Sequence, residues 1–471
     1  SEVSVYNTAV GHFAGGSVTE GVQNTLIGAL AGDALTHADF NIAVGYNALG
    51  AETRGERNVA IGNSALATQN NTSQGAVYNT AVGNNAGLSV TTGTQNTFVG
   101  GLAGDGATTA SGNNAFGYNA LGATCTGGNN QAFGVGALNA NTSGEGNIGI
   151  GLNALFANTG ADLNIAIGTG ALDAFNVSSG DTYNVAIGDQ AGGAMTTGVS
   201  NTILGGLAGD ALTDADENVA LGFSALTSDT LGSKTVAVGR GTLAAQNFTS
   251  ATDSYNVAVG YNAGLSVTTG TFNTLIGGQA GDALTTGKEQ VALGYKALSS
   301  ETNGHASTAI GYEALLSQNG AGATNVYNVA LGYHAGRLIT TGTENTLLGS
   351  LAADNLTTGN YNVAIGKSAL DAETAGHQSI AIGLQALAAQ NNSSSTNVFN
   401  VAIGSQAGLS VTTGVQNTLI GALAGDALTD ADYNTAIGYQ TLSADTRGSR
   451  STAVGFQALA NQNFSSATDA Y

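Results

Sequence analysis

A five-residue phrase recurs along the whole chain and leaves few folds open. It reads Asn, a variable residue, Ala, then Val or Ile, then Gly, as in Asn41–Gly45 and Asn58–Gly62. The phrase occurs 26 times, and its closing glycine is present in every copy. Successive copies keep a constant 17-residue step, which is lengthened by four residues, and once by three, at the end of each group of copies. A fixed short period of this kind indicates a repeat architecture in which each coil stacks on the next.

The coils are grouped at a higher level. Four coils make a super-repeat of 72 residues whose last coil is lengthened, and one group holds two extra coils. An aromatic residue closes each group, at Tyr78, Tyr183, Tyr255, Tyr327, Phe399 and Tyr471. We expect residues 1–6 to be the tail of a preceding coil, followed by super-repeats at 7–78, 79–183, 184–255, 256–327, 328–399 and 400–471. Neither end shows the cap that a solenoid needs, so we interpret the chain as one continuous solenoid cut from a longer array.

Each coil can be numbered from the first residue of its phrase, and the pattern then predicts which residues are buried. Position 3 is usually Ala and position 4 is usually Val, Ile or Leu, and the two point to opposite faces of a strand. We expect the aliphatic side chain at position 4 to fill the core and the alanine to form a tight packing surface. The glycine at position 5 predicts a turn with positive φ or with no room for a side chain. Three residues later comes an alanine, which predicts a second short strand.

Two short strands and two turns fit a 17-residue coil, whereas a pair of helices needs a longer repeat. Each strand is expected to pair in parallel with the same strand of the next coil, so the backbone finds its hydrogen bonds in neighbouring coils. Like residues then stack on like, and the asparagines at position 1 form an amide ladder. The predicted fold class is all-β, a parallel β-solenoid or β-roll of 26 coils.

The predicted interior is thin, because each coil offers few large aliphatic residues beside its alanines. Burial of one such residue contributes roughly 1.5–3 kcal/mol, whereas ordering the backbone costs about 1–2 kcal/mol per residue. The second coil of each group adds a larger residue at position 3, opposite position 4. Apolar surface on both faces of the strand predicts that several chains pack together, most simply as a homotrimer or another multi-chain filament.

The segment Asn184–Ala191, with the pattern Asn-x-Ala-Ile/Val-Gly-x-x-Ala, resembles the head repeats of trimeric autotransporter adhesins. Similar repeats occur in phage tail fibres, and the resemblance covers essentially the whole chain. It implies a left-handed parallel β-roll, three chains together, and surface adhesion. The coils here are longer than those usual in that family, and every fourth coil carries an extra loop. The resemblance places the protein outside the cell, on a cell surface or on a virion.

The net charge of −21, from 31 acidic and 10 basic residues, narrows the partners. Nucleic acid is excluded because its binding needs basic surface, and an anionic membrane is disfavoured for the same reason. The chain contains no run of about 20 apolar residues, so we predict no membrane contact for this segment. The single cysteine, Cys125, can form no intrachain disulfide and is expected in a turn.

Residues that could carry chemistry do not converge in the sequence. One aspartate recurs in each super-repeat (Asp33, Asp105, Asp210, Asp282, Asp354 and Asp426), about 19 Å from the next at ~4.8 Å per coil, too far apart to share a metal. The pairs Asp214/Asp216 and Asp430/Asp432 offer at most weak surface contacts to Ca²⁺. The five histidines lie at unrelated coil positions, and no nucleophile–base pair is evident. We therefore predict no metal site, no cofactor and no enzymatic activity.

The lengthened fourth coils hold the candidate binding loops. Their sequences fit the glycosylation pattern at Asn71, Asn176, Asn247, Asn392 and Asn463, whereas the loop at Asn319-Gly320 does not. A row of such loops suits glycan attachment or contact with a surface glycan or host receptor. The leading hypothesis is a structural extracellular fibre or adhesin that spaces or presents an attachment surface. The alternatives are a phage tail fibre or tailspike that binds or cleaves surface polysaccharide, and an ice-binding solenoid.

Overall fold

The computed structural model describes residues 5–320, 322, 324–464, 466 and 468–469. These residues form strands, turns and bridges, and contain no helix, so none that could cross a membrane. The chain divides into two compact units, residues 1–234 with 249–252 and residues 235–248 with 253–471. The division falls between the third and fourth coils of the super-repeat at 184–255.

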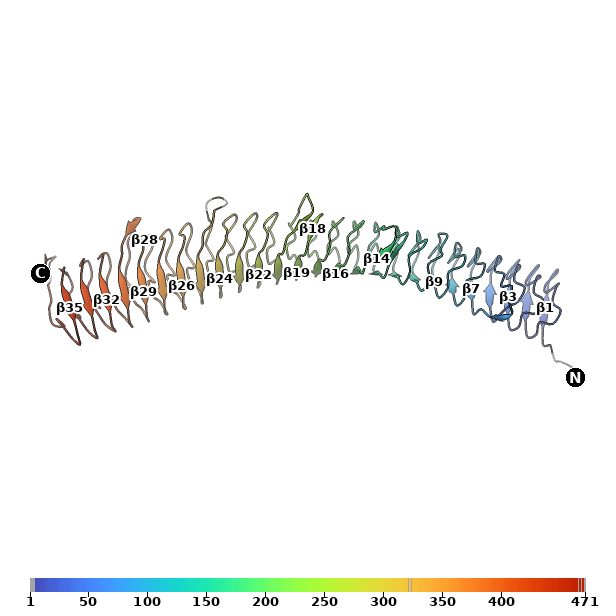
Figure 1. The fold of residues 1–471 in the computed structure, drawn as a ribbon, viewed down its shortest axis with the longest axis horizontal. Coiled ribbons are helices and arrows are strands. Elements are labelled where there is room, and N and C mark those ends of the chain that lie inside the picture. Colours follow the sequence, from blue (N-terminus) through green and yellow to red (C-terminus); the bar gives the residue numbers. More distant parts are fainter. Residues whose placement is uncertain (1–4, 321, 323, 465, 467, 470–471) are drawn as a thin grey trace. The chain divides into compact units, whose positions relative to one another are not determined.

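One three-residue strand marks each coil (Figure 1). In the first unit these strands are β1 (Thr8–Val10), β2 (Thr25–Ile27), β3 (Ile42–Val44), β5 (Val59–Ile61), β7 (Thr80–Val82), β8 (Thr97–Val99), β9 (Asn114–Phe116), β10 (Gln131–Phe133), β11 (Ile148–Ile150), β13 (Ile165–Ile167), β15 (Val185–Ile187), β16 (Thr202–Leu204) and β17 (Val219–Leu221). In the second they are β19 (Val236–Val238), β21 (Val257–Val259), β22 (Thr274–Ile276), β23 (Val291–Leu293), β24 (Thr308–Ile310), β25 (Val329–Leu331), β26 (Thr346–Leu348), β27 (Val363–Ile365), β29 (Ile380–Ile382), β31 (Val401–Ile403), β32 (Thr418–Ile420), β33 (Thr435–Ile437) and β35 (Thr452–Val454).

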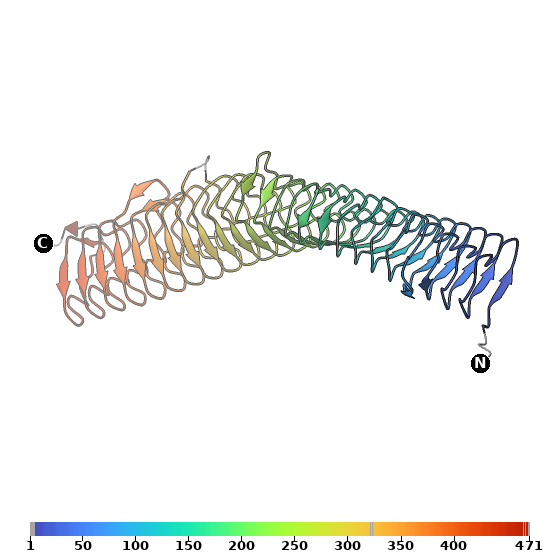
Figure 2. The same ribbon diagram turned by 45° about the vertical axis from the view of Figure 1, so that its right-hand side comes forward.

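Ten two-residue strands lie at the ends of the lengthened coils and of the coils directly before them, where the longer loops leave the stack (Figure 2). They are β4 (Gly55–Glu56), β6 (Gly75–Ala76), β12 (Ala161–Asp162), β14 (Gly180–Asp181), β18 (Gly232–Ser233), β20 (Thr252–Asp253), β28 (Gly376–His377), β30 (Thr396–Asn397), β34 (Gly448–Ser449) and β36 (Thr468–Asp469).

Within each unit every strand pairs in parallel with the strand of the next coil, in the register of the repeat. Leu26 of β2 stands beside Ala9 of β1 and Ala43 of β3. The same register holds in the second unit, where Ala258 of β21 pairs with Leu275 of β22. The prediction of an all-β parallel solenoid built on a 17-residue repeat is confirmed.

The inside and the outside of the strand are reversed relative to the sequence expectation. The middle residue, position 3, is buried in every one of these strands except β1, as with Ala60 in β5. Positions 2 and 4 face outward, and Ile61 at position 4 keeps 38% of its surface exposed. The prediction that position 4 fills the core was wrong. The interior is too narrow for two aliphatic side chains per strand, so it takes the small alanine.

Interior volume is shared between positions 3 and 9. Third coils combine Ala at position 3 with Leu at position 9, as in Ala43 and Leu49, both fully buried. Second coils reverse the sizes. Phe98 is buried at position 3, and a Cβ added to Gly104 at position 9 would lie 2.5 Å from its ring. Close packing of this kind explains why the larger residue at position 3 appears with a glycine six residues later, or with alanine at Ala353.

The segment that follows the position-5 glycine, where the second strand was predicted, is a turn in each coil, so that prediction was wrong. In the third coil Asn47 and Leu49 have φ of 53° and 56°, while the residues beside them do not have positive φ. This alternation turns the N–H groups of Asn47 and Leu49 toward opposite neighbouring coils. Asn47 N–H donates back to Ala29 O at 3.0 Å, and Leu49 N–H donates forward to Ala65 O at 2.9 Å. The segment is therefore bonded to both adjacent coils without being a strand.

The amide ladder at position 1 is confirmed. The backbone N–H of Asn41 donates to Oδ1 of Asn24 at 2.9 Å, and Oδ1 of Asn41 accepts the N–H of Asn58 at 2.9 Å. Nδ2 of Asn41 donates to Gly55 O, 14 residues on, at 3.0 Å. Each buried asparagine thus closes its own coil and joins it to the next, which is a structural role.

Candidate functional site

Position 12 carries a column of buried polar groups that the sequence reading missed. In first and second coils this position is mostly apolar, but in third coils it is a carboxylate and in fourth coils a glutamine. The buried carboxylates are Glu52, Asp229, Glu301, Glu373 and Asp445. In super-repeats 7–78, 256–327, 328–399 and 400–471 this carboxylate accepts a backbone N–H from the loop of the following, lengthened coil. Super-repeat 79–183 has no carboxylate at this position.

Glu373 shows which hydrogen bonds stabilise a buried carboxylate at position 12. Its Oε1 accepts the backbone N–H groups of Thr374, Ala375 and Gly376 at 2.9, 3.1 and 2.8 Å. It also accepts the N–H of Asn392, in the following coil, at 3.0 Å. A buried anion is tolerated only when such donors replace its water. The carboxylate therefore fixes both its own turn and the start of the loop above it.

The second carboxylate oxygen begins a chain of amides that crosses the lengthened coil. Oε2 of Glu373 accepts Nε2 of Gln390 at 2.8 Å. The same Nε2 reaches Oγ of Ser379 at 3.0 Å, and Oε1 of Gln390 accepts Nδ2 of Asn400 at 2.9 Å. In this coil serine replaces the asparagine at position 1, and Gln390 supplies the side-chain oxygen that bonds to the asparagine of the next coil. This accounts for the glutamine at position 12 of the fourth coil.

The super-repeat at 79–183 supports this interpretation because it lacks both the carboxylate and the glutamine at position 12. The coil before its lengthened coil has Asn158 at position 12, and the lengthened coil has Phe175, both fully buried. Nδ2 of Asn158 donates to Ala161 O at 3.1 Å. With no carboxylate below, the glutamine has no function, and an apolar ring fills its place.

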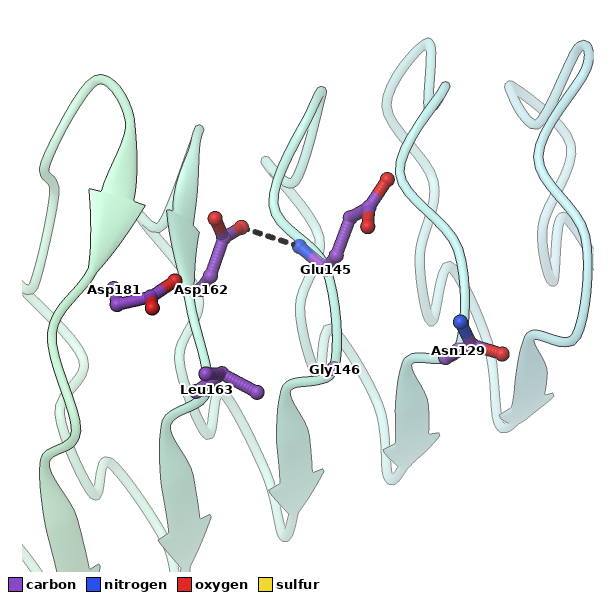
Figure 3. Close-up of a pocket in the computed structure, with 6 residues that line it drawn as sticks. All are labelled: Asn129, Glu145, Gly146, Asp162, Leu163 and Asp181. Carbon is purple, nitrogen blue, oxygen red and sulfur yellow. Dashed lines mark hydrogen bonds between the residues drawn. The ribbon is translucent and has the colours of Figure 1, made fainter.

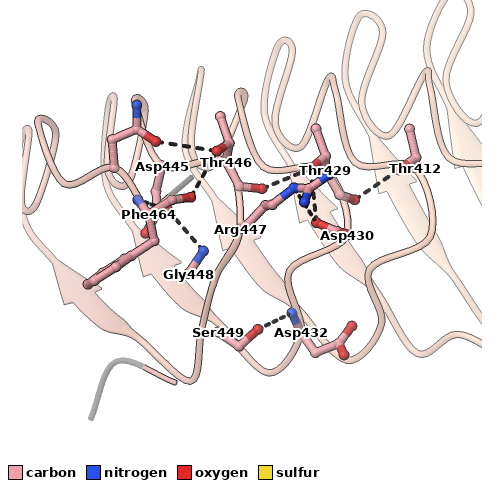
Figure 4. A network of polar contacts seen from close by, with 11 residues as sticks. Thr412, Thr429, Asp430, Asp432, Asp445, Thr446, Arg447, Gly448, Ser449 and Phe464 are labelled. Carbon is pink, nitrogen blue, oxygen red and sulfur yellow. Dashed lines mark hydrogen bonds and ion pairs between the residues drawn. The ribbon is translucent and has the colours of Figure 1, made fainter. Parts of the chain in front are cut away.

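The last super-repeat shows the aspartate version of the site (Figure 4). Oδ1 of Asp445 accepts the N–H groups of Gly448 at 3.0 Å and Phe464 at 3.1 Å. Beside it, threonine hydroxyls at position 13 step along the coils: Thr412 donates to Thr429 O at 3.2 Å, and Thr429 to Thr446 O at 2.9 Å.

The five candidate asparagines occupy two coil positions. Asn71 and Asn392 lie at position 14, and their Nδ2 atoms donate to Glu52 and Glu373 at 2.9 and 3.0 Å. Asn176, Asn247 and Asn463 lie one position earlier and are exposed.

Position 13 also holds Asn70, Asn319 and Asn391, so all six lengthened coils share this exposed asparagine. Its Oδ1 caps a threonine hydroxyl of the coil before, as Thr159 donates to Asn176 at 2.6 Å. A glycan on Nδ2 of Asn71 or Asn392 would remove a bond to a buried charge.

Two of the five histidines share a position, so the expectation of unrelated positions was wrong. His305 and His377 both lie at position 16, where Nδ1 accepts the N–H of Lys288 at 3.0 Å and of Asn360 at 2.8 Å. His377 Nε2 also bonds Oγ of Ser395 at 2.5 Å. Because Nδ1 is an acceptor, Nε2 of the neutral ring carries the proton and donates it. The imidazole therefore cannot take the proton of this hydroxyl.

Three of the recurrent aspartates at position 10, Asp210, Asp282 and Asp426, accept a hydroxyl of the next coil, and Asp354 bonds to the coil before it. Asp426 Oδ1 accepts Oγ of Ser443 at 2.6 Å, and Asp354 receives two bonds from Arg337, at 2.9 and 3.1 Å. Asp105 faces a coil with glycine at this position. Burial raises the pKa of Asp105, and its Oδ1 has no hydrogen-bond partner.

The aspartate pairs proposed for Ca²⁺ are engaged in the same way. Oδ1 of Asp216 accepts Val199 N–H at 2.8 Å, and Asp214 accepts Thr197 Oγ1 at 2.6 Å. Asp432 accepts Val415 N–H at 2.8 Å, and Asp430 lies 3.5 Å from Arg447 Nε. Among the described residues no group of three or more His, Cys, Asp or Glu side chains is placed to hold a metal ion.

An open groove of about 370 Å³ lies over the extra coils of super-repeat 79–183 (Figure 3). It is lined by Asn129, Glu145, Gly146, Asp162, Leu163 and Asp181. Oδ1 of Asp162 accepts the N–H of Glu145 at 2.7 Å, the same bond between position-16 residues that Asp39, Asp216 and Asp432 accept in other coils. The groove is thus an acidic stretch of the ordinary coil surface.

Cys125 is fully buried, and its thiol donates to Gly127 O at 3.3 Å. Burial raises the pKa of the thiol. We expect Cys125 to resist a thiol reagent at pH 8 until the chain unfolds, because the thiolate is the reactive form. Above the ordinary cysteine pKa the unfolded chain ionises first, so the contribution of this group to stability falls as pH rises. Reaction with an aromatic disulfide, with and without denaturant, measures this, and full reaction of the native chain would contradict it.

The outward face of the strands forms a regular surface that repeats from coil to coil in each unit. Positions 2 and 4 present valine, isoleucine, leucine and threonine, and several remain more than one-third exposed, such as Leu293 at 44%. Position 17, before the strand, adds rings and cations: Cζ of Arg57 lies 5.2 Å from the ring centre of Phe40 and 5.8 Å from that of Tyr78. Position 6, after the strand, adds further exposed aromatic residues.

Fold and site together define a parallel β-solenoid whose polar groups are used mainly to join its own coils. No protein-family model matches this chain, and no curated protein matches it.

Proposed function

We propose that this chain is a structural segment of an extracellular fibre, assembled from several copies and serving to space or present an attachment surface. The observation that carries the proposal is the outward face of the strands. Val, Ile and Leu recur at position 4 on consecutive coils, and exposed apolar patches of such length are rare on soluble monomers.

The interior supports the same proposal. Alanine fills most of position 3, so a coil buries few large side chains on its inner side. Packing the outward face against other copies would bury a second set of aliphatic residues per coil at roughly 25 cal/mol per Å². Three chains around an axis is the arrangement implied by the resemblance to trimeric autotransporter adhesins, and it gives each outward face a partner.

Analytical ultracentrifugation tests the proposal. We expect the chain to sediment as a multimer. The substitutions Ile61→Glu and Val82→Glu, both at outward-facing position 4 of adjacent coils, should shift it toward monomer. Glutamates at Thr72 and Ser73, exposed in the loop of the same coil, serve as the control and should leave the mass unchanged. A wild-type chain that remains monomeric across the concentration range would overturn the multi-chain proposal.

A surface role for the loops is a separate part of the proposal. The exposed asparagines Asn176, Asn247 and Asn463, rather than Asn71 and Asn392, are the positions at which a glycan or receptor could be engaged without disturbing the buried carboxylates. Binding of the chain to glycan arrays and cell surfaces, compared before and after substitution of these three residues by alanine, tests it. Unchanged binding would remove the loops as the attachment site.

A further inference from the structure

Three tyrosines stack on one another along one edge of the second unit. Tyr295, Tyr312 and Tyr333 occupy position 6 in three consecutive coils. The rings of Tyr295 and Tyr312 have centroids 5.4 Å apart and planes 28° apart, and those of Tyr312 and Tyr333 are 5.5 Å and 17° apart. The coil spacing enforces this contact, because neighbouring coils are about 4.8 Å apart.

The three rings are open to reagents and can move. Their exposed fractions are 44%, 45% and 51%. Exposed side chains change rotamer on the picosecond to nanosecond timescale, so stacked rings can tilt until two ortho carbons meet. The stacked tyrosine rings are therefore close to one another and still free to move into bonding contact.

The middle phenol also has a proton acceptor. Desolvation in the stack and the neighbouring Glu313 carboxylate raise the pKa of Tyr312. Nε2 of His334 lies 3.1 Å from Oε2 of Glu313, and its ring stacks on Tyr333 at 3.8 Å. Loss of an electron makes a phenol strongly acidic, so an adjacent carboxylate and imidazole favour oxidation by accepting the proton.

We propose that this stack is a site of oxidative cross-linking, at which Tyr312 forms dityrosine with Tyr295 or Tyr333. A peroxide, used by a haem peroxidase, is the oxidant. Each of two phenols gives up one electron and its proton, and the two radicals join through a carbon–carbon bond between ortho positions. The two ortho hydrogens then move to the phenolic oxygens, which restores both rings. Two electrons and two protons reduce one hydrogen peroxide to two water molecules.

Such a bond would staple neighbouring coils covalently. It would join Tyr312 to the tyrosine one coil before it or one coil after it, and so close a loop of one coil's length. A cross-link of this kind stabilises a chain mainly by restricting its unfolded state. The proposal concerns one chain and holds whether or not the fibre assembles.

The chain supplies its own controls. Tyr46, Tyr118 and Tyr261 lie at position 6 with exposed fractions of 56%, 58% and 54%, but no tyrosine occupies position 6 in the coils beside them. Tyr439 stacks on Phe456 at 5.6 Å and 17°, which is the same geometry without a second phenol.

The test is peroxidase and hydrogen peroxide on the dilute, folded chain, followed by dityrosine fluorescence and peptide mass spectrometry. We expect cross-linked peptides, each lighter by two hydrogen atoms, that join Tyr312 to Tyr295 or Tyr333. None should join Tyr46, Tyr118 or Tyr261 to a neighbouring coil. Cross-links spread over all exposed tyrosines, or no intrachain cross-link, would overturn the proposal.

Two variants complete the test. Tyr312→Phe keeps the stack but should abolish both cross-links, because Tyr295 and Tyr333 are then two coils apart. Phe456→Tyr should create a new cross-link to Tyr439. Circular dichroism confirms that each variant is folded. Persistence of a Tyr295–Tyr333 bond in the first variant, or no gain in the second, would show that stacking does not direct the reaction.

Discussion

Replacement of Gly45 by alanine is expected to destabilise the chain strongly. Its φ is 136°, a region open essentially to glycine. A Cβ there would lie 2.3 Å from Gly62 O in the next coil. Strain and a clash with backbone act together, so we expect a cost above about 4 kcal/mol. Thermal and urea unfolding of the variant measure it.

Gly75→Ala is the matched control. Gly75 lies in the loop of the next coil, has no positive φ, and a Cβ there would meet nothing within 4 Å. We expect its stability to change by no more than about 0.5 kcal/mol. Equal effects of the two substitutions would mean that the glycines at position 5 do not control the approach of neighbouring coils.

Substitution of Glu373 by glutamine is expected to open the loop above it. The side chain would place an NH₂ group against the amide donors of Gln390 and Asn392, which now bond to Oε2 at 2.8 and 3.0 Å. Each buried polar group left without a partner costs about 1–3 kcal/mol, so the expected total is roughly 2–5 kcal/mol. Hydrogen exchange of the amides of Thr374, Gly376 and Asn392 reports this opening locally.

A double-mutant cycle separates the pairing from the loss of charge. Gln390→Glu combined with Glu373→Gln restores a carboxylate–amide pair across the two coils, so the double variant should recover part of the lost protection. Glu344→Gln makes the same chemical change at an exposed position, and we expect no measurable opening there. Equal exchange in Glu373→Gln and Glu344→Gln would contradict the role given to the buried charge.

The sequence predicted the fold well because the solenoid is an expression of its period. A 17-residue step, a polar residue at position 1 and an invariant glycine at position 5 each have a direct physical consequence, and parallel stacking in register follows from them. Which face of the strand is buried could not be predicted in the same way. Ala60 and Ile61 are both apolar, and hydrophobicity alone assigns the larger one to the core. The opposite holds because the second half of the coil approaches too closely to leave room for it.

The candidate site was only partly predictable. The lengthened loops were visible as insertions, but the carboxylates beneath them were not, because position 12 is apolar in first and second coils and so reads as a variable position. One signal was present. An acidic residue at this position is followed by glutamine at the same position of the next coil, as at Glu52 and Gln69, and both are absent together at Asn158 and Phe175. Comparison of super-repeats, rather than of coils, reveals it.

The two positions of the candidate asparagines have the same explanation. The glycosylation pattern is satisfied one residue later in two loops than in the other three, and in those two the asparagine side chain belongs to the carboxylate. A pattern of three residues does not specify which amide is turned inward.

Distance measurement between spin labels tests the central claim, that the chain advances by one parallel coil per repeat, most directly. Nitroxides on Glu20, Thr92 and Thr197 of the first unit, taken in pairs, lie at exposed position 14 of coils four, six and ten steps apart. Cys125 is replaced by serine, and labelled chains are diluted with unlabelled ones. We predict separations close to 19, 29 and 48 Å, at ~4.8 Å per step. Separations that do not grow with the number of coils would contradict the solenoid.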